Sequence, residues 1–197
     1  MSYLRTVPID EATGVVRELY DEELAEDGRV RYQTELFSLR PDVYKAWGDL
    51  VRTIRGNMDL RRYELATLAA ARALRCRACV GAHAAVLESK FYDRAALEAI
   101  MRDYHAAGLA AVDVAIMELA EKVALHAYRV TPEDVSNLRG LGLTDVEIFD
   151  VVLASAARCF MSKTLDSMGS EPEPEYAETA QLLDLVELTA ADPRGSR

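Results

Sequence analysis

The stretch ELATLAAARALRCRACVGAHAAVLESK, residues 64–90, joins an alanine- and leucine-rich helical pattern to two cysteines and a histidine. Cys76, Cys79 and His83 occupy positions i, i+3 and i+7, so on a helix their side chains lie on one face. Three interpretations fit this pattern: a structural metal clip, a redox-active thiol pair, or buried cysteines beside a core histidine. The rest of the chain bears on the choice between them.

Apolar residues recur at three- and four-residue steps along most of the chain, which is the period of amphipathic helices. No segment alternates apolar and polar residues long enough for a convincing strand. These patterns predict an all-α helical bundle with short connections. The expected helical segments are 15–28, 34–40, 41–56, 59–74, 76–90, 94–108, 110–130, 131–142 and 144–169.

The chain divides into three parts by composition. Residues 1–40 are expected to form an N-terminal arm with helices, and residues 41–170 a single helical core. Residues 171–197 are expected to form a C-terminal linker and tail helix. The two prolines of EPEPEY predict an extended linker, and AETAQLLDLVELT predicts a last short helix.

The bulk composition excludes several classes of protein. With 33 acidic against 23 basic residues the net charge is −10, and no basic cluster is present, so nucleic acid is not expected as a partner. No apolar run approaches the roughly 20 residues that cross a bilayer, so no membrane partner is expected. The N-terminus lacks the pattern of a signal peptide, and three cysteines do not form a secreted disulfide framework. We therefore expect a cytoplasmic protein, in which a Cys-x-x-Cys pair indicates metal or redox chemistry.

A helix that begins near Arg75 places both cysteines in its first turns, where the helix dipole and free backbone N–H groups favour thiolate over thiol. His83 is then positioned to accept the proton of Cys79. Glu64 lies 12 positions before Cys76, about 18 Å along one continuous helix. It can face His83 only if the chain turns between them, and LRCRAC offers a weak signal of such a turn.

The metal-clip interpretation lacks a fourth ligand. A structural zinc site needs four, and no second Cys-x-x-Cys or His pair exists in the sequence. Cys159, His105 or His126 would have to be recruited from far along the chain. Cys159 is expected to pack as a small hydrophobe and both histidines to be structural. We therefore predict no metal, and inert buried thiols remain an alternative.

The pattern E-x11-C-x2-C-x3-H, filled by Glu64, Cys76, Cys79 and His83, resembles the motif of the alkylhydroperoxidase D-like, peroxidase-related proteins of the carboxymuconolactone decarboxylase superfamily. The flanking YELATLAAARALRCRACVGAHAAVL is also similar to the core helices of that family. The resemblance covers roughly residues 40–125, and TDVEIFDVVLASAARCFMSKTLDSMG extends it to about residue 175.

The resemblance implies an all-helical homotrimer or homohexamer that reduces organic or hydrogen peroxide, without a cofactor other than a redox-active disulfide. Cys79 would attack the peroxide, and Cys76, nearer the helix tip, would resolve the sulfenic acid and meet a dithiol or lipoyl-type electron donor. The opposite order of the two cysteines remains open. His83 and Glu64 would complete the catalytic set.

One position departs from the family pattern. Some members carry a histidine just before the second cysteine, where this chain has Ala78. Arg77 and Arg75 flank the pair instead, and their charges would favour thiolate without supplying a proton acceptor. Two other functions stay open. One is a lyase or isomerase of the decarboxylase branch, which does not depend on the cysteine pair. The other is a non-catalytic redox sensor or scaffold.

Overall fold

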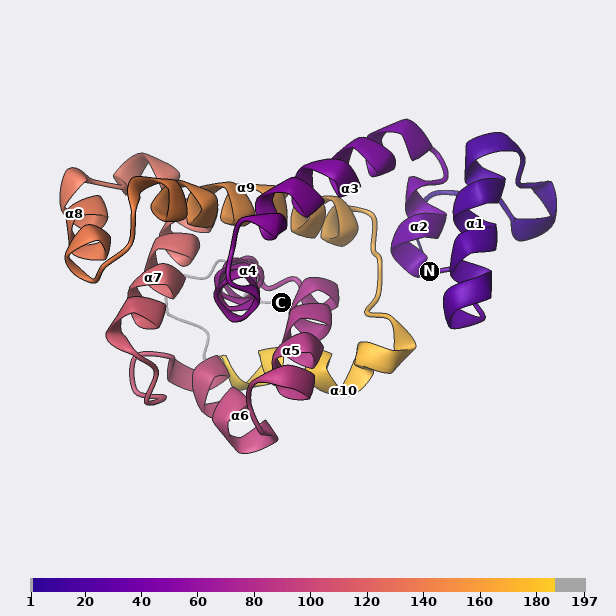
Figure 1. Cartoon of the computed structure of the whole chain (residues 1–197). Helices are drawn as coiled ribbons and strands as arrows, with labels where there is room; N and C mark the ends of the chain where they lie inside the picture. Colours follow the sequence, from indigo (N-terminus) through magenta and orange to yellow (C-terminus); the bar gives the residue numbers. More distant parts are fainter. Residues whose placement is uncertain (1, 187–197) are drawn as a thin grey trace.

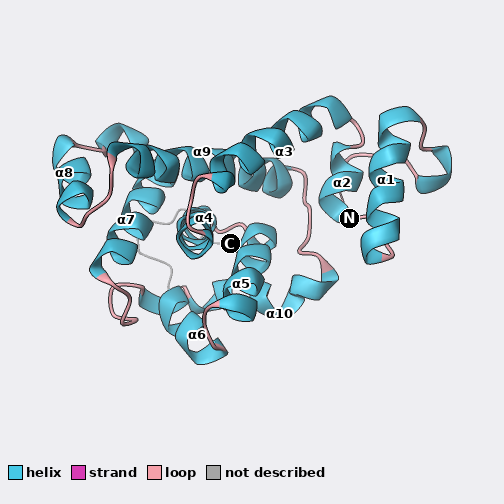
Figure 2. Ribbon diagram, in the orientation of Figure 1, coloured by secondary structure: helices cyan, strands magenta, loops and turns pink. Residues whose placement is uncertain are grey.

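A computed structural model describes residues 2–186, and within this range every regular element is helical (Figure 1, Figure 2). The predicted all-α class is confirmed. The helices are α1 (Gly14–Asp27), α2 (Tyr32–Phe37), α3 (Pro41–Gly56), α4 (Leu60–Leu74), α5 (Arg77–Lys90), α6 (Arg94–Asp103), α7 (Ala111–His126), α8 (Pro132–Gly140), α9 (Asp145–Ser167) and α10 (Ala177–Ala180). Short 3-10 helices lie at Ile9–Glu11, Ala127–Arg129, Pro174–Tyr176 and Gln181–Leu185.

Local signals set the helix ends where the sequence predicted them. Thr144 and Glu147 form a capping box at the start of α9, and Thr131 and Asp134 form another at the start of α8. Each box satisfies backbone N–H groups that the first helical turn leaves free. Gly28 ends α1 in the left-handed region at φ 72°, a conformation that glycine adopts without strain.

Helix α4 is the centre of the core. Figure 1 shows it almost along its axis, with α9, α7 and α5 packed around it. All its residues from Tyr63 to Ala71 are buried. The sequence permits this because small residues alternate with leucines there, so neighbouring helices approach α4 closely from several sides. A helix enclosed in this way holds its polar side chains in a rigid, poorly hydrated environment.

The N-terminal helices α1 and α2 lie at one end of the molecule, to the right in Figure 1. Helix α1 packs in a small core around Ala12, Tyr20 and Val30, whereas Leu36 and Phe37 of α2 belong to the main core. Arg29 attaches this end to the C-terminal segment, since its Nη1 lies 2.7 Å from Oε2 of Glu173.

Several expected boundaries were wrong, among them the end of α6, which lies at Asp103 and not at residue 108. The segment 34–40 was expected to be helical, but α2 runs from Tyr32 to Phe37, because the residue before Pro41 is driven out of the helical region. The expected extended linker at 171–176 is only partly extended, since Pro174 begins a 3-10 helix, a position that proline's fixed φ favours.

The tail packs against the core. The expected tail helix is divided into α10 and the 3-10 helix Gln181–Leu185, and its last residues lie outside the described part of the chain. Thr179 Oγ1 donates a 2.8 Å hydrogen bond to the carbonyl oxygen of Gly81 on α5. Between residues 2 and 186, none of the helices combines the length and apolar character needed to span a membrane.

Candidate functional site

The turn between α4 and α5 brings the predicted site residues together. Arg75 ends α4 in the left-handed region at φ 61°, and Cys76 is the N-cap residue of α5. The backbone N–H groups of Arg75 and Cys76 bond to the carbonyl oxygens of Arg72 and Ala71, each at 3.0 Å. These bonds stabilise a reversal that needs only two residues, so α5 folds back onto α4. The weak turn signal in the sequence was therefore correct.

The reversal places Glu64 of α4 directly against His83 of α5. Oε2 of Glu64 lies 2.6 Å from Nδ1 of His83, and Thr67 Oγ1 lies 3.1 Å from the same nitrogen. The other carboxylate oxygen, Oε1, lies 3.9 Å from Nη2 of Arg55. A carboxylate oxygen accepts hydrogen bonds, so Nδ1 of His83 carries the proton and Nε2 holds the lone pair.

His83 is a neutral base in this environment. Burial lowers the pKa of His83, and the charge of Arg158 lowers it further, while Glu64 acts in the opposite direction. The net direction is below the ordinary value near 6.5, so the imidazole is unprotonated at neutral pH. A neutral imidazole with a free Nε2 can accept a thiol proton.

The two cysteines are both free thiols and both enclosed: Cys76 is 0% exposed and Cys79 is 3% exposed. The Cys76 thiol donates a hydrogen bond to the sulfur of Cys79, which holds the pKa of Cys79 well below its ordinary value. The same contact, together with burial, raises the pKa of Cys76. Cys79 is therefore the thiolate of the pair and Cys76 its protonated partner.

Cys76 is expected, as the residue nearer the helix tip, to meet the electron donor, yet its side chain has no exposed surface in this structure. The reason is tertiary: α4, α9 and the tail segments α10 and Gln181–Leu185 pack on α5.

Arg158, which the sequence analysis did not select, supplies the positive charge beside the thiolate. It projects from α9, is 7% exposed, and its Nη1 lies 3.4 Å from Sγ of Cys79. Its charge lowers the pKa of Cys79, as does the nearby Ser162 hydroxyl. A signal was present, because Val151, Ser155, Arg158 and Ser162 share the buried face of α9, and arginine rarely lies on such a face unpaired.

The arginines that flank the cysteine pair do not have the expected role. The Nη2 of Arg77 forms an ion pair with Asp184 in the C-terminal segment, and its Nη1 lies 3.4 Å from the carbonyl oxygen of Ala180. The guanidinium of Arg77 is thereby directed toward the tail. Sequence adjacency misled here, because residues next to each other on a helix point to different sides.

The side chains considered for a metal clip do not converge. His105 lies on the surface, with Nδ1 3.0 Å from Asp103 and Nε2 3.0 Å from Glu118. His126 packs edge-on against Tyr128, and Cys159 is half-buried on α9 with its pKa raised by burial. Across residues 2–186, no three His, Cys, Asp or Glu side chains are grouped so as to hold a metal ion.

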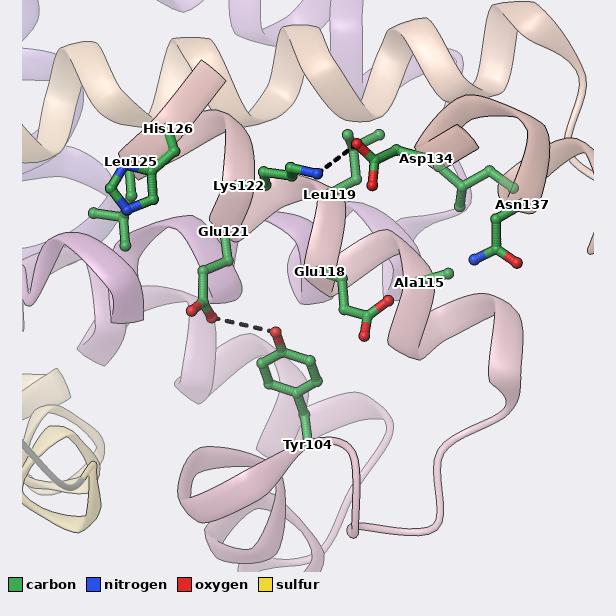
Figure 3. A pocket seen from close by; sticks show the side chains of 11 residues that line it. Tyr104, Ala115, Glu118, Leu119, Glu121, Lys122, Leu125, His126, Asp134 and Asn137 are labelled. Atoms are coloured by element: carbon green, nitrogen blue, oxygen red, sulfur yellow. Dashed lines mark hydrogen bonds and ion pairs between the residues drawn. The ribbon is translucent and has the colours of Figure 1, made fainter. Parts of the chain in front are cut away.

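A pocket of about 450 Å³ between α7 and α8 is separate from the thiol pair (Figure 3). Its polar side chains satisfy one another: Lys122 Nζ lies 2.6 Å from Asp134, and the Tyr104 hydroxyl donates to Glu121 at 3.3 Å. None of the four predicted site residues lines it. The chemistry of the molecule is therefore concentrated where α4, α5 and α9 meet.

Part of the chain matches a known protein family. Residues 41–131 match the model of the carboxymuconolactone decarboxylase family. None of the curated proteins compared with the chain matches it.

Several solved structures share the fold. An uncharacterised peroxidase-related protein from Ralstonia eutropha JMP134, described as an alkylhydroperoxidase AhpD core, superposes with a TM-score of 0.80 at 21% identity, over 91% of this chain and 96% of that one. A peroxidase-related protein from Silicibacter sp. TM1040 gives 0.76 at 16% identity, over 89% and 95%. The debrominase Bmp8 gives 0.74 at 13% identity, over 93% and 99%. The shared fold thus occurs in proteins with different activities.

Proposed function

We propose that this chain, whose residues 41–131 match the model of the carboxymuconolactone decarboxylase family, is an alkylhydroperoxidase D-like, thiol-dependent peroxidase that uses the Cys76–Cys79 pair. The observation that carries the proposal is the contact of Nη1 of Arg158 with Sγ of Cys79 at 3.4 Å, one helical turn from the His83 that Glu64 orients. Cys79 is held as a thiolate by Cys76 and Arg158, beside a neutral His83 that Glu64 orients. A nucleophilic sulfur, a resolving thiol and a base are the groups that a dithiol peroxidase needs.

In the first step the Cys79 thiolate attacks the terminal oxygen of a hydroperoxide. The S–O bond forms, the O–O bond breaks, and its electron pair leaves with the other oxygen as an alkoxide, or as hydroxide from hydrogen peroxide. A proton from solvent, passed on by Nε2 of His83, converts that oxygen to an alcohol or water. Cys79 becomes a sulfenic acid.

In the second step the Cys76 thiol attacks the sulfur of the sulfenic acid. The Cys76–Cys79 disulfide forms and water leaves, which takes up the thiol proton. The raised pKa of Cys76 suits this order, because Cys76 stays protonated until Cys79 has been oxidised. Cys79 as attacker and Cys76 as resolver is therefore the order that we propose.

A dithiol or lipoyl-type donor then reduces the disulfide through a mixed disulfide. Since both sulfurs are buried, we propose that the donor reaches them only after the tail on α5 moves, or through a small dithiol rather than a protein surface. The cycle needs a reducing compartment, and we place the protein in the cytoplasm on that ground.

The position of Ala78 makes His83 the main proton acceptor. Ala78 offers no proton-relay group between the two cysteines. Glu64 is a positioning residue, since its contact is with Nδ1 of His83 and not with the sulfur. Loss of His83 should therefore slow the cycle more than it would in a site with two histidines.

The test is a single anaerobic turnover. The protein is reduced, mixed with one equivalent of an alkyl hydroperoxide, and mapped by peptide mass spectrometry, with metal content measured on the same sample. We expect rapid Cys76–Cys79 disulfide in metal-free protein, a stalled sulfenic acid at Cys79 in Cys76→Ser, and no oxidation in Cys79→Ser. Unreacted thiols, or stoichiometric zinc, would disprove the proposal. Sustained turnover with a dithiol separates a peroxidase from a redox sensor, and an activity that survives both serine variants would indicate a lyase.

We also propose that the chain assembles with copies of itself through the outer face of α9. Val146, Phe149 and Phe160 are exposed along this face, and Leu50 is exposed on α3, which packs against α9. An apolar stripe of this kind is typical of a subunit contact. Light scattering on a sizing column should give the mass of a trimer or hexamer, reduced by Phe149→Ser; a monomer in the parent protein would refute it.

A further inference from the structure

We propose that Arg158 and Ser162, one turn apart on α9, form a donor site beside Cys79 that holds its sulfur as a thiolate and receives the oxygen that leaves the hydroperoxide. This inference rests on the proposed peroxidase function and adds two residues to its site. It assigns to α9 a chemical role that the motif on α4 and α5 does not contain.

The contacts of Arg158 indicate that the sulfur of Cys79 carries a negative charge. Its side chain is buried, and its Nη1 donates to Sγ of Cys79 at 3.4 Å. The Tyr63 phenol is its other hydrogen-bonding neighbour. Arginine stays charged in proteins, and a buried guanidinium requires a negative group nearby. In the part of the chain that the structure describes, the Cys79 thiolate is that group.

Two hydrogen-bond donors near Cys79 have no partner among the described residues. They are Nε of Arg158 and the hydroxyl of Ser162, and both atoms are buried. The Ser162 hydroxyl lies close enough to Cys79 to lower the pKa of the thiol. The geometry between the two groups is not that of a regular hydrogen bond. Folded proteins rarely leave buried donors unpaired, so such donors beside a reactive sulfur indicate a species that is bound only during reaction.

The indole ring of Trp47 lies against the guanidinium of Arg158. The guanidinium carbon of Arg158 lies 6.0 Å from the centroid of the indole ring, and the buried Nε1 of Trp47 also has no partner in the described chain. The indole limits how far the Arg158 side chain can swing away from Cys79. Its contribution is therefore to position Arg158.

The departing oxygen needs such donors. As the Cys79 thiolate attacks, negative charge moves from sulfur to the oxygen that leaves with the O–O electron pair. The fixed charge of Arg158 stabilises the sulfur before the step, and its Nε–H and the Ser162 hydroxyl donate to the departing oxygen during it. Arg158 keeps its protons throughout, and the proton that converts alkoxide to alcohol comes from solvent through Nε2 of His83.

The experiment uses the full chain with Cys76→Ser and Cys159→Ser, so that Cys79 is the only thiol and the serine hydroxyl at position 76 keeps a donor toward it. Arg158→Lys, Arg158→Met and Ser162→Ala are compared in this background. Matched controls on α9 are Lys163→Met, which removes an exposed cation, and Ser155→Ala, whose buried hydroxyl already donates to the carbonyl oxygen of Val151 at 2.7 Å. Circular dichroism verifies folding, and Arg158→Lys and Ser162→Ala decide the outcome if Arg158→Met is unfolded.

Thiolate absorbance against pH is the first readout, because it requires neither access to the sulfur nor peroxidase activity. Arg158→Met should show about tenfold less thiolate than the parent at the acidic end of the titration, and Arg158→Lys, which keeps the charge but not the geometry of its donors, and Ser162→Ala smaller losses. The second readout compares rates at a pH where every variant is fully thiolate. There, oxidation by an alkyl hydroperoxide should fall about tenfold or more, while alkylation by iodoacetamide, whose leaving group needs no donor, should not.

The possible outcomes separate the inference from the proposed function. An unchanged thiolate titration in every folded variant overturns the role of Arg158 and Ser162, whatever the peroxidase result. Equal losses toward peroxide and iodoacetamide overturn the role at the leaving oxygen. A parent protein that holds the thiolate through Arg158 but does not react with hydroperoxide contradicts the proposed function and the leaving-oxygen role, and supports the effect of Arg158 on sulfur.

Discussion

Nδ1 of His83 lies 2.6 Å from Oε2 of Glu64, although 19 positions separate the two residues in the sequence. The contact exists because Arg75 turns the chain sharply between α4 and α5. It is buried, and it leaves the Nε2 lone pair of His83 available. Glu64 thus influences the thiols through His83 rather than by touching them.

Glu64→Gln should lower the rate of Cys79 oxidation by an alkyl hydroperoxide about 10²-fold. The amide nitrogen of glutamine can donate to Nδ1 of His83, which moves the proton to Nε2 and removes the base. Quenched-flow mixing with peptide mass spectrometry measures the rate.

The matched control for this prediction is Glu98→Gln. Glu98 is a half-buried acid on α6 whose Oε2 lies 3.8 Å from Arg102, far in the chain from the thiol pair, so its loss should leave the oxidation rate unchanged. If Glu64→Gln oxidises as fast as this control, the orientation of His83 by Glu64 has no role in the reaction.

The reduced protein should carry one thiolate per chain at neutral pH, although it has three cysteines. The pKa of Cys79 is lowered, whereas the pKa values of Cys76 and Cys159 are raised. Thiolate character is present above the pKa of a cysteine and is lost as pH falls through it, so the peroxide rate should stay high below the ordinary value near 8.5 and fall only in acid. Thiolate absorbance near 240 nm, with Cys79→Ser as reference, follows the titration. The absence of a thiolate at about pH 7 would contradict the prediction.

Thr144→Ala should lower the free energy of unfolding by about 1 kcal/mol. The N–H of Glu147 donates to Oγ1 of Thr144 at 3.3 Å, and the N–H of Thr144 donates to Oε2 of Glu147 at 2.8 Å. Removing the hydroxyl leaves a backbone donor free at the start of α9, the helix that carries Arg158. Urea unfolding measures the loss, and Thr144→Ser should restore most of it. Equal stability of the alanine and serine variants would show that the box contributes nothing.

Gly81→Ala should displace the C-terminal segment from α5. A Cβ at position 81 would lie 3.0 Å from the carbonyl oxygen of Tyr176 and 3.1 Å from Cβ of Ala180. Contacts this short force the tail to move, at a cost of about 1–3 kcal/mol in unfolding free energy. Limited proteolysis should cleave the tail faster, and Gly48→Ala, where a Cβ meets nothing within 4 Å, is the control. Unchanged proteolysis would mean that the tail is not held against Gly81.

Most of the fold was predictable from local patterns. Helix starts at Thr131 and Thr144 and the end of α1 at Gly28 follow from capping chemistry that acts within a few residues. The errors arose where local and longer-range effects compete. Residues 174–176 looked extended from the prolines around them, but they form a 3-10 helix that packs on α5.

The candidate site was predictable only in part. The spacing of Cys76, Cys79 and His83 places them on one helix, and the sequence alone determined this, because helical periodicity is a local property. Arg158 could not be assigned to the thiols, since its distance from Cys79 along the chain, 79 positions, is bridged only by the packing of α9 against α4 and α5.

The sequence by itself therefore determined an all-α chain with a thiol pair at the start of a helix and a histidine one turn further on. Only the tertiary structure decided which thiol is ionised. That decision depends on burial and on charges from other helices, Arg158 beside Cys79 and Glu64 beside His83, and such fields act through space rather than along the chain.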